Sequence, residues 1–322
     1  MIRWKKRIWA AALSAALMAG ASGYGGGIPI VSEVRETEGY PDAQTMLIIA
    51  TEANRCRQVY TDQIWQVKVG ADDEDFQSYL LEEIRTFLKE LKTMNLLADE
   101  REISLTSQER EQLGELSGEY YDSLTAEDKA YTGAGEQDVY DMYEAYHRAN
   151  KLVDELTKDV DLEISDSEAK VIRVQEIRLT DQAKAQELYR RVTEEGADFA
   201  SVARSMSEDG ATEKAVGRSE RSKAYEDAVF SLEAGQISQV FEDGGSWYIV
   251  RCADDYDEEA TLERKNRLAL QRKNQAFRQI YDAFAAEHPV EISGDIWGSV
   301  SLADSGGSVT TDFFERYAER ME

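Results

Sequence analysis

The chain reads GADFASVARSMSED over residues 196–209, AYEDAVFSLEAGQIS over 224–238 and GGSWYIVRC over 244–252. These three blocks stand in order within the length of a single domain. Gly235, in the second block, permits a tight turn because glycine adopts positive φ angles without steric cost. After the third block, acidic residues at 254–259 lead into a predicted long helix with regularly spaced apolar residues, which Pro289 ends. The blocks therefore predict a small domain that a long helix follows.

The same blocks resemble, in the same order, the motifs of the parvulin (PpiC-type) peptidyl-prolyl isomerase domain. In that family, G-x-x-F leads into a short helix that ends near S-x-D, followed by F-x-x-A-x-F-x-L-x-x-G-x-I-S and a last strand. The resemblance covers residues 168–256. It implies a small antiparallel sheet with surrounding helices, in the order strand, three helices and two strands. The helices are expected over 181–195, 198–207 and 225–232.

The departures from the family pattern fall on its active site. Two histidines normally face each other there, and in this sequence Glu176 and Tyr248 occupy their positions. The family's G-G-D-L-G-x-F loop is reduced to a shorter run around residues 215–218. The resemblance therefore implies a kept scaffold with an altered site.

Other positions of the site match the family better. Asp209 stands where the family has Asp or Cys, and Tyr225 matches an aromatic residue that lines the proline pocket. The resemblance implies that Asp209 is a catalytic position, together with the substituted Glu176 and Tyr248. It also implies that Tyr225 and Phe230 bind the substrate.

The chemistry that this site would perform needs no nucleophile. An X–Pro bond interconverts over a barrier of about 18–20 kcal/mol without any covalent bond being broken. An isomerase needs only to bind the twisted amide best, in a dry pocket with well-placed donors. If Glu176 and Asp209 lie close together, each raises the proton affinity of the other, and one could stay protonated as a donor. The alternative, that Glu176 and Tyr248 fill an inactive cleft, stays open.

The first 21 residues have the pattern of a secretory signal peptide. Four basic residues lie among the first seven, an apolar run follows over 8–19, and Ala19-Gly20-Ala21 forms an A-x-A cleavage signal. The apolar run is shorter than the ~20 residues of a spanning helix, and Ala21 stands where a lipoprotein signal requires cysteine. We expect an exported, extracytoplasmic protein, in the cell envelope or secreted. An uncleaved signal that serves as an anchor is the alternative.

The acidic composition agrees with an exported protein and makes some classes of binding partner unfavourable. The formal net charge of −27 disfavours nucleic acid and bare anionic membrane, because both carry phosphate charge. The expected partners are unfolded or proline-containing exported polypeptides, with peripheral contact to the outer face of the membrane left open. His147 and His288 are too few and too separated for a metal site, so neither metal nor cofactor is expected. A disulfide between Cys56 and Cys252 is also left open.

The region before the parvulin-like part is predicted to be mainly helical. The glycine-containing, polar stretch 22–45 indicates a linker, and the apolar run Met46–Ile49 favours a strand. Apolar residues three and four apart predict helices over 76–91 and 139–156. Thr106 and Glu109 have the spacing of a capping box at the start of a further helix.

The predicted organisation is of the α+β class. Its segments are a signal peptide (1–21), a linker (22–45), a helical chaperone-like region (46–165), a parvulin-like domain (166–256) and a long helix with its tail (257–322). This layout resembles PrsA- and SurA-type foldases, in which the sequences before and after the parvulin domain fold into one helical lobe. Each flanking segment here carries an apolar stripe that must be covered, which supports the same arrangement.

Three functions remain open at this point. The first is a chaperone or foldase for exported proteins whose parvulin-like domain binds clients or is a weak isomerase. The second is an active prolyl isomerase with a rewired site. The third is an envelope structural or assembly protein that uses the scaffold to hold one partner. The absence of both histidines favours the first function over the second.

Overall fold

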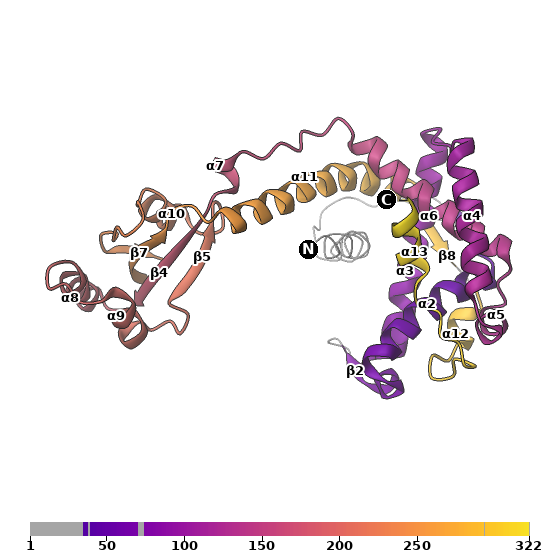
Figure 1. Cartoon of the computed structure of the whole chain (residues 1–322), viewed down its shortest axis with the longest axis horizontal. Coiled ribbons are helices and arrows are strands. Elements are labelled where there is room, and N and C mark those ends of the chain that lie inside the picture. Colours follow the sequence, from indigo (N-terminus) through magenta and orange to yellow (C-terminus); the bar gives the residue numbers. More distant parts are fainter. Residues whose placement is uncertain (1–34, 38, 70–73, 293, 322) are drawn as a thin grey trace. The chain divides into compact units, whose positions relative to one another are not determined.

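A computed structural model describes residues 35–37, 39–69, 74–292 and 294–321. The chain divides into two compact units, unit 1 (Met1–Asp159 with Ala276–Glu322) and unit 2 (Val160–Gln275). The predicted signal peptide and residues 22–34 of the predicted linker lie outside the described residues. Figure 1 traces both units along the sequence.

Unit 1 is built mainly from helices that both ends of the chain contribute (Figure 1). The amino-terminal segment forms α2 (Asp42–Tyr60), α3 (Phe76–Glu100), α4 (Ser107–Ser123), α5 (Ala126–Thr132) and α6 (Glu136–Thr157). The carboxyl-terminal segment adds the end of α11 (Glu258–Glu287), α12 (Ile296–Ser299) and α13 (Phe313–Met321). The 3-10 helix η1 (Asp62–Gln66) and the strands β2 (Lys68–Val69) and β3 (Glu74–Asp75) connect α2 to α3. Strand β1 (Arg35–Thr37) pairs in parallel with β8 (Val290–Ile292), which joins the two segments.

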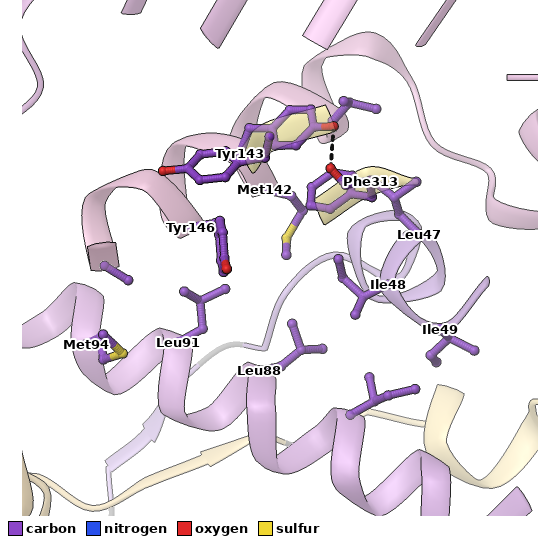
Figure 2. Packing of buried hydrophobic residues seen from close by; sticks show 14 of the residues in the cluster. Leu47, Ile48, Ile49, Leu88, Leu91, Met94, Met142, Tyr143, Tyr146 and Phe313 are labelled. Carbon is purple, nitrogen blue, oxygen red and sulfur yellow. Dashed lines mark hydrogen bonds between the residues drawn. The ribbon is translucent and has the colours of Figure 1, made fainter. Parts of the chain in front are cut away.

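The core of unit 1 lies where α2, α3 and α6 meet the carboxyl-terminal segment (Figure 2). Leu47 and Leu88 are fully buried there. The ring of Phe313, from α13, stacks on the ring of Tyr143, from α6, with centroids 4.1 Å apart and an interplanar angle of 5°. The Tyr143 hydroxyl donates a hydrogen bond to the backbone carbonyl of Phe313 at 3.0 Å. The amino-terminal helices therefore close their core with a residue from the other end of the chain.

Helix starts in unit 1 follow local capping rules. The predicted capping box is confirmed at α4, where the backbone N–H of Glu109 donates to Thr106 Oγ1 at 3.2 Å. In return, the Thr106 N–H donates to the Glu109 carboxylate at 2.6 Å. Asp75 caps α3 by accepting a bond from the Ser78 N–H at 2.8 Å. Each cap satisfies backbone donors that a helix leaves unpaired at its start.

Two predictions for the amino-terminal region are wrong. The run Met46–Ile49 lies within α2 and is no strand. Leu47, Ile48 and Ile49 are each at most 1% exposed, and a stretch of helix buried at consecutive positions shows no amphipathic period. The predicted linker 22–45 also contains β1 and the start of α2. Pro41 immediately precedes α2, a place where its missing N–H costs nothing.

Unit 2 contains a sheet of four antiparallel strands in the order β5-β4-β7-β6. Its elements are α7 (Asp166–Ala169), β4 (Val171–Leu179), α8 (Gln182–Thr193), α9 (Phe199–Met206), β5 (Glu213–Gly217), α10 (Lys223–Val229), β6 (Phe241–Asp243) and β7 (Ser246–Asp254). The α+β fold class is confirmed. Gly235 has a φ of 89°, which agrees with the tight turn predicted there.

The sequence did not predict strand β5. Residues 215–218 were interpreted as a reduced loop, but Glu213–Gly217 forms an edge strand with Val216 paired to Ile172 of β4. Only Val216 and Gly217 of this short strand are buried. Its sequence therefore lacks the alternation of apolar and polar residues by which a strand is recognised. The strand matters because it carries a residue of the candidate site.

The first turns of α11 pack on the sheet of unit 2. Thr261 Oγ1 accepts a hydrogen bond from the Val171 N–H of β4 at 3.0 Å. The guanidinium of Arg264 binds the Glu220 carboxylate and the backbone carbonyl of Arg218. Gly217 lies against this guanidinium so closely that a Cβ atom on it would collide with Arg264 Nη1. The start of α11 therefore packs against the sheet of unit 2 and belongs to that unit.

Candidate functional site

Glu176 and Tyr248, the two residues expected at the positions of the family's histidines, lie on the central strands of the unit 2 sheet. Strands β4 and β7 pair so that Glu176 lies opposite Val250 and Tyr248 lies opposite Arg178. Alternate residues of a strand share one face of a sheet, so Glu176 and Tyr248 point to the face that packs on α10. Glu176 is 1% exposed and Tyr248 is 7% exposed. Both side chains are therefore part of the interior.

Both carboxylate oxygens of Glu176 are engaged. Oε1 accepts a hydrogen bond from Lys214 Nζ at 2.7 Å, and Oε2 accepts one from the Tyr225 hydroxyl at 2.7 Å. A carboxylate that leaves water needs such partners, since burying an unpaired charge costs several kcal/mol or more. Glu176 is thus the centre of a hydrogen-bonded network that uses both of its carboxylate oxygens.

Lys214 extends this network to Asp209. Its ammonium donates to Asp209 Oδ2 at 2.8 Å while it also binds Glu176. The expectation that a neighbouring carboxylate keeps Asp209 protonated is wrong, because the Lys214 ammonium stands between Asp209 and Glu176. The hydrogen bond from Lys214 holds the pKa of the Asp209 carboxyl below its usual range. Asp209 is therefore an acceptor in this network rather than a protonated donor.

The other two members of the network stay in their ordinary protonation states at neutral pH. Burial disfavours the charged form of Lys214, but hydrogen bonds to Asp209 and Glu176 outweigh it and raise the pKa of the ammonium. Burial, together with the neighbouring charge of Glu176, raises the pKa of the Tyr225 hydroxyl. Lys214 is charged and Tyr225 is neutral as a result, so both act as hydrogen-bond donors.

Aromatic rings close the site on the α10 side. Tyr225 is fully buried, and its ring meets Phe241 at 5.6 Å and Tyr248 at 5.9 Å, both edge to face. Phe241 and Tyr248 stack on each other at 5.6 Å. Edge-to-face and offset pairs of this kind add to the stability that burial gives. The rings thus occupy the space between α10 and the sheet.

Two arginines cover the rings expected to bind substrate. The Arg221 guanidinium lies 4.3 Å from the centroid of Tyr225, and that of Arg218 lies 4.4 Å from the centroid of Phe230. Phe230 is itself only 8% exposed. Cation–π contacts hold these guanidinium groups over the ring faces.

The structure brings the five expected site residues into one region of unit 2. Tyr225 contacts both Glu176 and Tyr248, and Asp209 joins Glu176 through Lys214. Phe230 belongs to the same buried cluster as Tyr225 and Tyr248.

Sequence reasoning missed Lys214, although it holds the network together. Lys214 of β5 pairs with Val174 of β4, and this register places the Lys214 side chain beside Glu176. That register depends on β5, which the sequence did not reveal. The only local indication was that Lys214 stands two residues before the apolar Val216. Such spacing is common on strands whose polar face is solvated, so it does not point to a site.

The chemistry open to this arrangement is hydrogen bonding by charged groups. It contains no activated nucleophile, and its most buried member, Tyr225, already donates to Glu176. The solvent-facing part of the network is the ion pair of Lys214 and Asp209, whose side chains are 21% and 29% exposed. A ligand would meet these two charges before any other member.

The described residues offer neither a metal site nor a membrane-spanning helix. Among these residues, no group of three or more His, Cys, Asp or Glu side chains is placed to hold a metal ion. In the same ranges, no helix is both long enough and apolar enough to cross a membrane. Cys56 and Cys252 are both free thiols, so the disulfide left open by the sequence is not formed.

Comparison with known proteins agrees with the sequence blocks. Residues 171–254 match the family model "Rotamase: PPIC-type PPIASE domain". The resemblance to the parvulin family is thereby confirmed, and the chain contains a parvulin-type domain. A search of curated proteins found no match.

Several solved structures are similar to the chain at low identity. The peptidylprolyl isomerase PrsA of Bacillus cereus is 21% identical with a TM-score of 0.40, over 74% of this chain and 93% of that chain. The foldase protein PrsA of Streptococcus pneumoniae is 18% identical with a TM-score of 0.29, over 69% and 87% of the two chains. PrsA of Bacillus subtilis is 14% identical with a TM-score of 0.28, over 85% and 98%.

Proposed function

We propose that this chain, which contains a parvulin-type domain, is an exported folding factor. Unit 1 binds unfolded polypeptides, and the parvulin-type domain braces or binds clients with little or no isomerase activity. The proposal of export rests on the signal-peptide pattern of residues 1–21 and on the acidic composition. The proposal of a folding role rests on the parvulin-type domain and on the flanking helical segments.

One observation carries the proposal of weak or lost catalysis. By the resemblance, Glu176 and Tyr248 stand at the positions of the family's histidines, and both oxygens of the Glu176 carboxylate already accept hydrogen bonds, from Lys214 and Tyr225. A twisted prolyl amide needs donors that are free to meet it in the transition state. Here the Tyr225 hydroxyl donates within the domain, and Phe241 and Tyr248 pack on its ring. A prolyl ring would have to displace this aromatic set.

The first test measures cis/trans exchange of a short proline peptide by NMR in the presence of the full chain without residues 1–21. We expect no exchange broadening beyond that of the free peptide. A parvulin with both histidines serves as the positive control. Catalysed exchange that disappears in Glu176→Gln would contradict the proposal and identify an active enzyme with a rewired site.

The second test measures aggregation of reduced, unfolded polypeptides of unrelated sequence. A folding factor is expected to suppress the aggregation of several of them at comparable ratios. Suppression of a single one would favour the envelope assembly protein, which holds one partner. No suppression of any client would overturn the folding role.

A second candidate function, the active isomerase, rests on Lys214. Its side chain is 21% exposed, so the ammonium can meet a substrate carbonyl at the edge of the network. In that case Lys214→Met abolishes exchange while Tyr248→Phe preserves it. Equal exchange in wild type and Lys214→Met excludes this route.

A further inference from the structure

Two arginines of unit 2 lie close in sequence and have no acidic partner. Arg218 follows β5 and Arg221 precedes α10, and both are half-buried. Within the described part of the chain, neither guanidinium forms a hydrogen bond or an ion pair. The Nε atom of Arg218 is buried, whereas its two Nη atoms and all three guanidinium nitrogens of Arg221 remain accessible to solvent. These nitrogens are therefore open to a ligand.

Aromatic rings hold the two guanidinium groups in place. The Arg221 Cζ atom lies 4.3 Å from the centroid of the Tyr225 ring, and the Arg218 Cζ atom lies 4.4 Å from that of Phe230. Both rings belong to one buried cluster on the α10 side of the sheet. Stacking uses the face of a guanidinium and leaves free the N–H groups in its plane, which a carboxylate binds with two hydrogen bonds. The donors are thus oriented before a ligand arrives, which lowers the entropy cost of binding.

The loop that carries both arginines is tied to its surroundings by Glu220. Glu220 Oε2 accepts a hydrogen bond from the Gly217 N–H at 2.9 Å, and Oε1 pairs with Arg264 and Arg267 of α11. Arg264 also donates to the backbone carbonyl of Arg218. Glu220 is the only acidic residue between the two loop arginines in the sequence. Because it is engaged with α11, it does not neutralise either of them.

The charge of this region is positive although the chain as a whole is acidic. Residues 217–230 contain three basic and three acidic residues, and one pair of these, Lys223 and Asp227, forms an ion pair at 2.7 Å. With Arg264 and Arg267, which bind Glu220, the region has five basic against three acidic residues, a net charge of +2. The formal net charge of the whole chain is −27. The region therefore attracts an anion where the rest of the chain repels one.

We propose that Arg218 and Arg221 bind an acidic polypeptide segment, with each guanidinium donating two hydrogen bonds to one Asp or Glu carboxylate of that segment. The segment lies over the guanidinium groups and leaves the rings beneath them packed, so its binding requires no prolyl residue. A polypeptide is favoured over an anionic membrane because the acidic remainder of the chain is repelled by a densely charged surface. This proposal rests on the proposed function and names the class of client that the parvulin-type domain binds.

The test uses the full chain without residues 1–21 and a fluorescein-labelled peptide of alternating glutamate and serine, with fluorescence anisotropy as the readout. The pair variant carries Arg218→Gln and Arg221→Gln. The matched control carries Arg190→Gln and Arg204→Gln, which removes the same charge from exposed positions on α8 and α9. A peptide of alternating glutamine and serine measures binding that does not depend on carboxylates. Unfolding midpoints check that every variant folds.

We expect the pair variant to lose about tenfold or more in affinity, equivalent to ~1.4 kcal/mol, and the control to bind like wild type. Arg218→Lys with Arg221→Lys keeps the charge but not the planar fork, so it should lose about threefold. This lysine variant decides the question if the glutamine substitutions unfold the domain.

Several results would overturn the proposal. Equal losses in the pair variant and the control would show that only net charge matters. Equal binding of the glutamate and glutamine peptides would show that carboxylates are not recognised. Full affinity in the lysine variant would show that the guanidinium groups are not required.

A second probe, a vesicle of phosphatidylglycerol, separates a polypeptide from a lipid surface. Pelleting of the wild type with these vesicles that is lost in the pair variant would identify an anionic membrane as the occupant and overturn the proposal. Failure of the wild type to bind the glutamate peptide while it still suppresses client aggregation would overturn the arginines as a client site and leave the folding role intact. The folding role itself fails only if the wild type suppresses no client.

Discussion

Buried tyrosines occupy the cores of both units, but their hydroxyl groups have different partners. In unit 1, Tyr143 donates to the backbone carbonyl of Phe313 at 3.0 Å, and Tyr120 shares a 2.7 Å bond with Thr310 Oγ1. In unit 2, Tyr225 donates to the Glu176 carboxylate, which also binds Lys214. The first arrangement is neutral, whereas the second carries formal charges into the interior.

The difference predicts how each core fails. A neutral core loses packing when a ring is removed, and the cost grows with the cavity that remains. A charged network loses little as long as every member is present, but the removal of one member leaves another buried without its partner. Substitutions that remove packing in one unit and a charge in the other therefore test whether the two cores are stabilised differently.

The largest effect is expected from Phe313→Ala in unit 1. Phe313 is fully buried and stacks on Tyr143 at 4.1 Å, so its loss should lower the free energy of unfolding by about 4 kcal/mol. Hydrogen exchange of peptides from α6 measures the change in this unit. The neighbouring Phe314, which is only partly buried, provides the control. A cost for Phe313→Ala no greater than that of Phe314→Ala would contradict the packing account.

The next effect is expected from Glu176→Ala in unit 2. The change leaves the Tyr225 hydroxyl without its acceptor and Lys214 with Asp209 alone, at a cost of about 3 kcal/mol. Hydrogen exchange of peptides from β4 is the readout. Glu213→Ala, an exposed change on β5, should stay within about 0.5 kcal/mol of wild type. If the two substitutions cost the same, the network does not stabilise unit 2 as proposed.

A smaller effect tests how tightly the edge of unit 2 is packed. A Cβ at Gly217 would collide with the Arg264 guanidinium, whose residue is 6% exposed. Gly217→Ala should therefore cost about 1–3 kcal/mol through overpacking, measured by urea unfolding. Gly210 has no atom within 4 Å of a Cβ position, so Gly210→Ala supplies the matched control. Similar unfolding midpoints for the two variants would show that Arg264 moves aside freely.

The smallest expected effect is a difference between the two units in how their stability depends on pH. In unit 1, burial raises the pKa of Glu90 to about 7, although Arg278 opposes this rise. Its contribution to stability is complete below its unfolded pKa of about 4.3 and is lost as pH rises through about 7. Glu90→Gln should thus gain of the order of 1 kcal/mol over wild type between pH 5 and pH 8.

The network of unit 2 should not change over that range. The pKa of Asp209 is lowered, so its contribution is lost only as pH falls below its usual value of about 3.9. The pKa of Lys214 is raised, so its contribution persists until pH exceeds its usual value of about 10.4. Hydrogen exchange of peptides from α6 and from β4, measured at pH 5 and at pH 8, compares the pH dependence of stability in the two units. A pH-dependent loss in β4 that Asp209→Asn removes would refute it.

The sequence predicted the features that local patterns encode. The capping box at Thr106 and Glu109, the turn at Gly235 and the parvulin-type motifs are short-range signals, and the structure or the family match agrees with them. Met46–Ile49 was misread because this part of α2 is buried at consecutive positions and so shows no helical alternation of apolar and polar residues. Lys214 was missed because its role depends on the pairing of β5 with β4. Register between strands is a tertiary property that no single stretch of sequence carries.

The parallel pairing of β1 with β8 and the stacking of Phe313 on Tyr143 also set the order in which the chain can mature. Synthesis runs from the amino terminus, so all of unit 2 leaves the ribosome before β8 and α13 exist. Domains tend to fold as soon as they are complete. The amino-terminal helices of unit 1 must therefore wait, with their aromatic core open, until the last few dozen residues arrive. A chain stalled or clipped before Phe313 would carry a finished parvulin-type domain beside an unfinished partner.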